Sequence, residues 1–275
     1  MNLIEVKNLH FSYPDSDELL KGINLTFDCS STAIIGQNGA GKTTFVKLLK
    51  GLLKPVSGDI LICGANTKQI SVAKLAAYIG LVFQNPGDQI FKSSVYDEVI
   101  FGPLNIGIPA GEADENTKRA LEQVGLESKV RDNPYDLSFS ERKLVSIASI
   151  LAMDTRIVLL DEPTMAQDYP GKRLIKALIR KLEREGKLVI SILHDMDFVA
   201  ETFKRTIVFQ DGKVRIDSDT KSVFSQTDAL RAADLEPPHV TQLSHQLGYD
   251  EAYLTAEQFV ADRLRERQKL KTGRS

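Results

Sequence analysis

The feature that most constrains the fold is a glycine-rich loop between an apolar strand and a helix. After the apolar residues Ala33–Ile35 the chain reads Gly36-Gln37-Asn38-Gly39-Ala40-Gly41-Lys42-Thr43-Thr44, which satisfies the pattern G-x-x-x-x-G-K-[ST]. Glycines let the backbone turn tightly and direct successive N–H groups at phosphate oxygens, and the following helix adds its positive N-terminal end. The loop therefore predicts a nucleotide site, with Lys42 reaching the β- and γ-phosphates and Thr43 a ligand of Mg²⁺.

The rest of the chain alternates predicted strands and helices. Apolar runs rich in β-branched residues predict strands at Leu3–Leu9, Ile23–Phe27, Ala33–Ile35, Asp59–Ile62, Ile79–Phe83, Ile157–Leu160, Leu188–Leu193 and Thr206–Phe209. Helical periodicity lies at about 43–53, 114–125, 141–153, 170–184 and 197–203. Because later strands are apolar throughout rather than alternating, both faces of their sheet are expected to be covered, as in an α/β fold.

Two stretches interrupt this alternation. Residues from about 92 to 153 are mainly helical, and no strand is expected beyond about 220, where Pro237-Pro238 opens a helical segment. We expect a domain over residues 1–220 with an inserted helical subdomain at about 92–153, followed by a C-terminal helical extension over 221–275.

Polar side chains follow two of the apolar strands. Asp161 and Glu162 end the first, and leaving adjacent acids there is costly unless a metal or polar partners receive them. Asp161 is placed to hold Mg²⁺, and Glu162 to polarise an attacking water as general base. His194 ends the next strand. A lone histidine there is commonly structural, but its order after a phosphate loop and an Asp-Glu strand favours a contact with the γ-phosphate.

Composition argues against several classes of protein. The net charge is −2, without the basic surplus expected of a nucleic-acid binder. No stretch reaches the ~18 consecutive apolar residues of a membrane span, and the N-terminus lacks the pattern of a signal peptide. The two cysteines, Cys29 and Cys63, are expected to be buried free thiols. We therefore expect a soluble protein whose membrane role, if any, comes through a partner.

Taken in order, these residues resemble the ATPase subunits of ABC transporters. That family has an aromatic residue that stacks on adenine, matched by Tyr13, and a glutamine that touches Mg²⁺ and signals to a membrane partner, matched by Gln84. Its signature L-S-G-G-Q reads the γ-phosphate of the opposite subunit and corresponds here to Leu137-Ser138-Phe139-Ser140-Glu141. Only the first two positions match. Met165-Ala166-Gln167-Asp168 likewise departs from the usual S-A-L-D.

The resemblance implies a fold and a site. The fold is a P-loop NTPase ABC domain, with a RecA-like core, a β-subdomain and an inserted helical subdomain. ATP would contact Tyr13, Gln37, Asn38, Gly39, Ala40, Gly41, Lys42, Thr43 and Thr44, and Ser138, Ser140 and Glu141 across a dimer. Mg²⁺ would be held by Thr43, Gln84 and Asp161. Catalysis would rest on Glu162, His194 and Gln84.

Two further stretches narrow the resemblance to energy-coupling factor ATPases, which power the import of vitamins or metal ions. They are Gln84-Asn85-Pro86-Gly87-Asp88-Gln89-Ile90-Phe91 and the segment that begins Glu236-Pro237-Pro238-His239. The resemblance implies a membrane-embedded coupling subunit, a substrate-binding membrane subunit, and a peripheral position on the cytoplasmic face of the membrane. It leaves the transported substrate open.

The weak signature bears on the second ATPase of the dimer. This chain's own phosphate loop, carboxylates and histidine are intact, so it can supply the catalytic half of a site, whereas its signature would complete a partner's site poorly. This favours a heterodimer with a second ATPase whose signature is closer to the family pattern. A homodimer is the main alternative. Two other classes stay open: an ABC ATPase acting on nucleic acid or ribosomes, and a low-turnover regulatory half of a heterodimer. A single cassette without a heptad run or basic surplus disfavours the first, and Glu162 with His194 disfavours the second.

Overall fold

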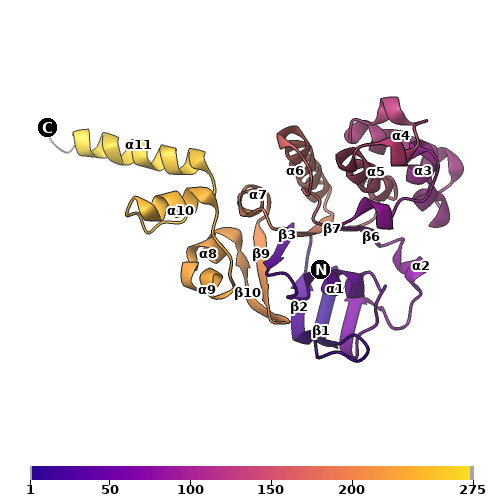
Figure 1. The fold of residues 1–275 in the computed structure, drawn as a ribbon, viewed down its shortest axis with the longest axis horizontal. Coiled ribbons are helices and arrows are strands. Elements are labelled where there is room, and N and C mark those ends of the chain that lie inside the picture. The colour runs from indigo at the N-terminus through magenta and orange to yellow at the C-terminus, as the bar shows by residue number, and fades with distance from the viewer. Residues whose placement is uncertain (1, 273–275) are drawn as a thin grey trace.

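The computed structural model describes residues 2–272, whose strands form two sheets (Figure 1). The smaller sheet is antiparallel, in the order β2–β1–β4–β5, with bounds Leu20–Phe27, Ile4–Phe11, Ser57–Ile62 and Ala65–Asn66. The larger sheet has the order β10–β9–β3–β8–β7–β6, with bounds Lys213–Asp219, Arg205–Gln210, Thr32–Gly36, Leu188–Ile192, Ile157–Asp161 and Ile79–Val82. Its strands are parallel except β10, so the carboxyl ends of β3, β7 and β8 lie at one edge.

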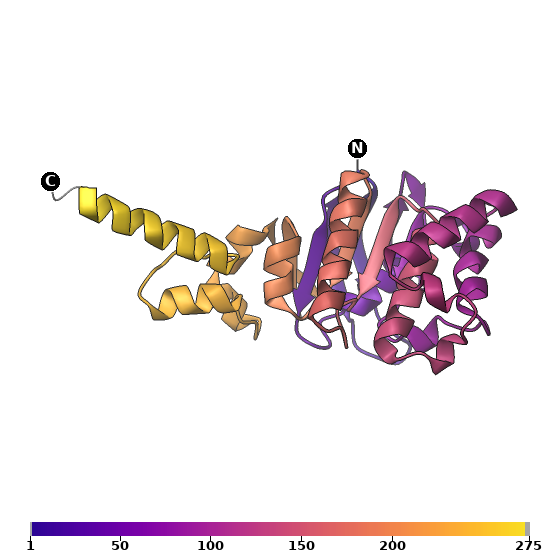
Figure 2. The same ribbon diagram turned by 90° about the horizontal axis from the view of Figure 1, so that it is seen from above.

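Helices surround the sheets and extend beyond them. Their bounds are α1 Lys42–Leu49, α2 Val72–Leu75, α3 Val95–Asn105, α4 Ala110–Gln123, α5 Phe139–Ala152, α6 Tyr169–Arg184, α7 Met196–Thr202, α8 Thr220–Ser225, α9 Thr227–Ala232, α10 His239–Gln246 and α11 Ala256–Thr272. Three 3₁₀ turns are η1 Pro86–Asp88, η2 Glu127–Lys129 and η3 Pro134–Asp136. Helices α3–α5 gather at one end of the molecule, while α10 and α11 project from the other (Figures 1 and 2).

The parallel strands of the larger sheet are buried on both faces, as their apolar sequences predict. Along β7, Val158 and Leu160 join a core shared with α5–α8, whereas Ile157 and Leu159 face a second core with α1 and the smaller sheet. Because neighbouring side chains of a strand point to opposite faces, an unbroken apolar run is what such a covered sheet requires. This burial fixes the strand ends that carry the polar residues.

All eight predicted strands are present, with ends that coincide with the predicted ones or differ by at most three residues. The predictions missed β5, which has two residues, and β10, whose sequence KVRIDSD is polar because it is an exposed edge strand. The expectation of buried thiols was wrong for Cys29, which is exposed, and Cys63 is only half-buried. Cys29 lies in the short connection between β2 and β3, where the preceding Asp28 is also exposed.

The segment after β10 begins within the core. Val223 and Phe224 of α8 are fully buried in the cluster shared with α5–α7, and Leu230 follows from α9. The expected domain division after residue 220 remains a prediction, and its residues 273–275 lie outside the described part of the chain. Within residues 2–272, no helix is both long and apolar enough to cross a membrane.

Candidate nucleotide site

The phosphate loop joins β3 to α1 with backbone geometry that excludes side chains at two glycines. Gly36 has φ of 150°, and a Cβ there would lie 2.2 Å from the carbonyl oxygen of Phe209. Gly41 has φ of 94° as the N-cap of α1, and a Cβ would lie 2.5 Å from Cδ2 of Leu20. Between them Asn38 and Gly39 are exposed and Ala40 is buried. The loop thus leaves the N-terminus of α1 open to an anion.

Lys42 is folded back onto this loop. Its Nζ donates to the carbonyl oxygens of Gly36 at 2.6 Å and Gln37 at 2.7 Å. Burial lowers the pKa of Lys42, while the nearby charges of Glu162 and Asp161 raise it. A buried ammonium held only by carbonyl oxygens is ready to exchange them for the stronger, charged acceptors of a phosphate.

Asp161 ends β7 almost completely buried, with a relative exposure of 3%. Its Oδ1 has no hydrogen-bond partner. Burial raises the pKa of this carboxyl, and the hydrogen bond with Thr43 lowers it. A buried carboxylate oxygen without a partner, beside a threonine hydroxyl, is the donor set that a hard divalent cation such as Mg²⁺ takes, so these residues fit the metal.

Glu162 and His194 line one pocket at the ends of β7 and β8. Nε2 of His194 lies 3.1 Å from Oε1 of Glu162. The pocket has a volume of about 320 Å³ and is also lined by Thr164, Met165, Lys172 and Asp195. Glu162 has φ of 47°, an unfavourable conformation for a residue with a Cβ, and such strain gathers where side chains must be aimed. Two of the three predicted catalytic groups are therefore brought together, and Gln84 is not among the residues that line this pocket.

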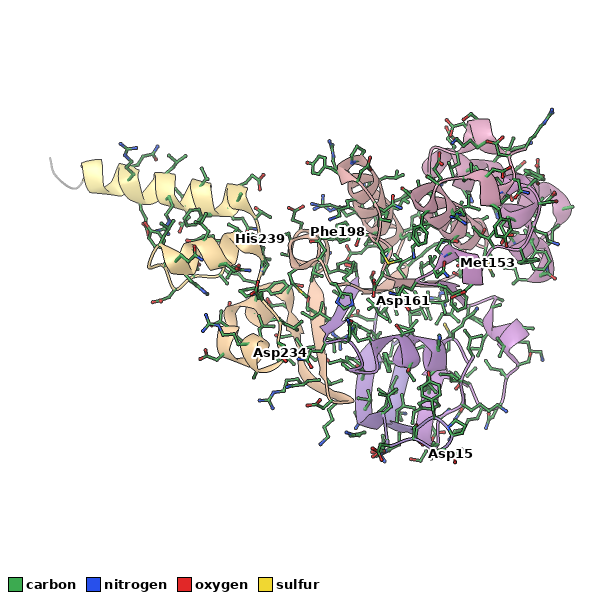
Figure 3. The ribbon with its side chains drawn as sticks, in the orientation of Figure 1. Asp15, Met153, Asp161, Phe198, Asp234 and His239 are labelled. Atoms are coloured by element: carbon green, nitrogen blue, oxygen red, sulfur yellow. The ribbon has the colours of Figure 1, made fainter. Side chains whose placement is uncertain are left out.

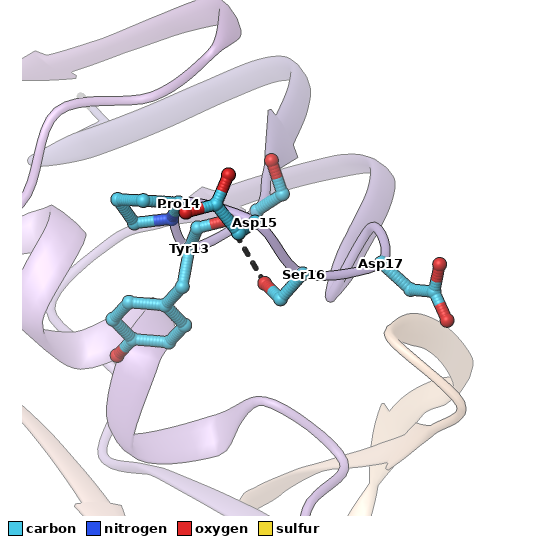
Figure 4. Close-up of a pocket in the computed structure, with 6 residues that line it drawn as sticks. Tyr13, Pro14, Asp15, Ser16 and Asp17 are labelled. Carbon is cyan, nitrogen blue, oxygen red and sulfur yellow. Dashed lines mark hydrogen bonds between the residues drawn. The ribbon is translucent and has the colours of Figure 1, made fainter.

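Tyr13 lies over the start of α1. Its hydroxyl is 3.1 Å from Oγ1 of Thr44, and its ring packs edge-on against Phe11 with centroids 4.9 Å apart. Figure 4 shows the ring on one side of its turn, away from the carboxylate of Asp17. The turn borders an open pocket of about 860 Å³, and Tyr13 is 40% exposed. An exposed aromatic face beside the phosphate loop is available for a base.

The backbone of Gln84 is linked to the end of β7 through Lys143. The side chain of Gln84 is exposed, and its carbonyl accepts a hydrogen bond from Nζ of Lys143, a fully buried lysine of α5. The same Nζ donates to the carbonyl of Phe83 at 2.9 Å and lies 3.5 Å from that of Asp161. Burial lowers the pKa of Lys143 to about 8. Lys143 was not among the predicted residues, because nothing in its sequence position distinguishes it from a surface lysine.

The signature segment begins α5 and is engaged within its own chain. Ser138 is the N-cap, and its hydroxyl and the Glu141 carboxylate form a reciprocal capping box. Glu141 also pairs with Lys129, and hydrogen bonds from Lys129 and Ser138 lower its pKa to about 2. Ser140 bonds to Gln167. Ser138, Ser140 and Glu141 are not among the residues lining the Glu162 pocket of the same chain.

The segment that follows β10 also reaches the phosphate loop, a relationship the sequence did not indicate. The Gln37 side chain donates to the carboxylate of Asp234. Further along, Asp197 at the start of α7 accepts from the backbone N–H of His239 at 2.9 Å and pairs with its imidazole. The hydrogen bond to Asp197 raises the pKa of His239. Figure 3 places Asp234 and His239 on the side of the projecting helices and Asp161 near the middle of the molecule.

Comparison with known proteins agrees with this geometry. A family model described as "ABC transporter" matches residues 20–165. A putative ABC transporter ATP-binding protein of Pyrococcus furiosus is 41% identical over 90% of this chain and 94% of its own length. The energy-coupling factor transporter ATP-binding protein EcfA of Methanocaldococcus jannaschii is 39% identical over 88% of both chains.

Two solved structures are similar in fold and sequence. CbiO1 of Clostridium perfringens, described as part of the transporter complex cbiONQ, superposes with a TM-score of 0.74 and 33% identity, over 90% of this chain and 98% of its own. A dimeric ATP-binding cassette with ADP and Pi bound superposes with a TM-score of 0.72 and 26% identity, over 79% of this chain and 98% of its own.

Proposed function

The chain belongs to the ABC transporter family of ATP-binding proteins, and from that membership we propose that it is the ATPase subunit of an energy-coupling factor importer. One observation carries the proposal. The contact between Glu162 and His194 lies beside a phosphate loop, in a chain that aligns with a relative of that name over 88% of both lengths. The transported solute, vitamin or metal ion, is left open.

Each part of the site has a role in the proposed hydrolysis. Tyr13 stacks on adenine, the loop from Gln37 to Thr44 holds the phosphates, and Lys42 moves from the loop carbonyls to the β- and γ-phosphates. Thr43, Asp161 and Gln84 would hold Mg²⁺, and the metal would supply positive charge to the phosphate oxygens. Glu162 takes a proton from the attacking water. His194 lies within hydrogen-bond reach of Glu162, and its ring N–H donates to the γ-phosphate.

A second ATPase completes each site. In the proposed sandwich, Ser138, Ser140 and Glu141 face the nucleotide bound by the partner. Because Glu141 is held by Ser138 and Lys129 of its own chain and carries a negative charge, the site that it completes is the weaker one. This supports a heterodimer in which the second ATPase supplies the better signature, with a homodimer as the alternative.

A candidate surface for the membrane subunit lies in and around the segment that follows Gln84 in the sequence. Phe91 and Tyr135 are 56% and 53% exposed, and Phe101 and Leu104 extend the apolar patch. The rings of Phe91 and Phe101 meet edge-on at 4.8 Å, which fixes their position. Exposed aromatic side chains in a fixed arrangement are typical of an interaction site. We propose that this patch receives the membrane-embedded coupling subunit, which holds the chain at the cytoplasmic face of the membrane.

The test is transport by liposomes that contain the chain together with its partner ATPase and membrane subunits. ATP inside the liposomes is expected to drive solute movement with the native chain and not with Glu162→Gln. Equal transport by the two proteins would contradict the proposal.

A further inference from the structure

The two segments in which this chain departs from its family pattern contact each other. Ser140 stands at a glycine position of the signature, and Gln167 lies in the loop between β7 and α6. Oγ of Ser140 donates to Oε1 of Gln167 at 2.9 Å, and Nε2 of Gln167 donates to the carbonyl of Ser140 at 3.1 Å. The two bonds satisfy both ends of the amide.

The pair is a built contact rather than a chance surface approach. Gln167 is only 8% exposed, so its amide has exchanged water for these two bonds, and leaving it unpaired there would cost free energy. A glycine at position 140 has no hydroxyl, and a leucine at position 167 has no donor or acceptor. Each departure therefore supplies what the other needs.

Gln167 belongs to the loop that carries the catalytic carboxylate. That loop starts at Glu162 and ends at Asp168, the N-cap of α6, and both Glu162 and Ala166 have positive φ. A second link joins the same two regions one turn further along α5. Lys143 holds the carbonyls of Phe83 and Gln84 and reaches that of Asp161. The signature end of α5 is thus fastened to the segments that line this chain's own site.

We propose that Gln167 is a positioning residue that couples the nucleotide state of this chain's own site to the signature turn it presents to the partner. The inference rests on the proposed function. Rearrangement of Glu162 and Gln84 around bound nucleotide moves the loop that contains Gln167, and the paired bonds carry that movement to Ser140.

The chain contains no tryptophan, so Phe139→Trp places a single tryptophan at the signature turn. Mg-ATP is added to this reporter protein and its emission is followed, while binding of a labelled nucleotide is measured separately. Light scattering at the same concentration selects conditions in which the chain is monomeric, so that a partner's nucleotide does not contribute. The inference predicts an emission change that saturates with nucleotide binding.

Gln167→Leu in the reporter background is expected to bind nucleotide with the same affinity and to lose the emission change. Ser140→Ala, which removes one of the two bonds, should lose part of it, and the double variant should lose no more than Gln167→Leu, because the two residues act as one unit. A full emission change in Gln167→Leu, or none in the unmodified reporter with nucleotide bound, overturns the coupling. Failure to bind nucleotide at all would instead count against the proposed function.

Discussion

The imidazole Nε2 of His194 lies 3.1 Å from Oε1 of Glu162, across the pocket where two parallel strands end. The residues are 32 positions apart in sequence, and only the register of β7 with β8 brings them together. A carboxylate held by a neighbouring imidazole in a small pocket is arranged to receive a proton from water.

Replacing Glu162 by glutamine tests that arrangement. Glu162→Gln keeps the volume and removes the base, so turnover should fall by roughly 10²–10⁴-fold while nucleotide affinity stays close to native. Phosphate release and labelled-nucleotide binding measure the two quantities. Glu122→Gln, on the exposed face of α4, makes the same chemical change away from the site and should be silent. Native turnover in Glu162→Gln would remove Glu162 from the mechanism.

Tyr13 offers a test of how the adenine of the nucleotide is held. Tyr13→Ala removes the ring and should weaken nucleotide binding by about 1–3 kcal/mol, the range found for stacking of a base on an aromatic side chain. Tyr13→Phe is the matched control, because it keeps the ring and loses only the bond to Thr44. It should bind within a few-fold of the native chain. Equal losses in the two variants would assign the effect to the hydroxyl instead.

Asp161 links stability to pH and to metal. The pKa of the Asp161 carboxyl is higher in the folded chain than in the unfolded chain. Protonated Asp161 therefore contributes fully to the free energy of unfolding below the pKa of the unfolded chain, and this contribution is lost as pH rises through the pKa of the folded chain. At neutral pH the metal-free protein therefore carries a destabilising buried charge. Asp161→Asn should raise its thermal midpoint by a few degrees, on the order of 1 kcal/mol, and should abolish stabilisation by Mg-ATP. In the native chain that stabilisation should weaken as pH falls. A lower midpoint for metal-free Asp161→Asn would contradict this account.

Asp234 places a negative charge next to the phosphate loop through its bond to Gln37. The phosphates of a bound nucleotide repel the Asp234 carboxylate, and the Gln37 side chain is held by that carboxylate instead of being free for the nucleotide. Asp234→Ala should therefore tighten nucleotide binding by roughly two- to tenfold at low salt, and less at high salt. Asp228 is exposed on α9, the helix that precedes Asp234. Asp228→Ala changes the net charge by the same amount and serves as the control. Weaker binding in Asp234→Ala would show that the contact supports the loop rather than opposing the ligand.

Local sequence patterns predicted the elements that carry the site, for a physical reason. The phosphate loop and the acids after Ile157–Leu160 lie where an apolar strand meets a polar end, and both signals are contained within ten residues. The contacts of Lys143, Gln167 and Asp234 were not predictable in this way. Each contact joins segments that lie tens of residues apart or more in the sequence. No local pattern marks these side chains, because only the register of the larger sheet and the placement of α5 and α9 bring their partners close. The polar edge strand β10 was missed because its stability comes from pairing with β9 rather than from its own composition.

The central claim is that this chain supplies the catalytic residues of its own ATP site, but that its signature segment, Leu137–Glu141, cannot complete the ATP site of a second copy of the chain. It is tested most directly by the mass of Glu162→Gln in solution with Mg-ATP, measured by light scattering after size exclusion, with nucleotide binding confirmed in the same sample. The account predicts that the protein binds ATP and keeps the mass of a single chain, because closure needs the signature of a different ATPase. A doubling of mass on adding ATP would contradict it and establish that Leu137–Glu141 can close a sandwich between two copies of this chain.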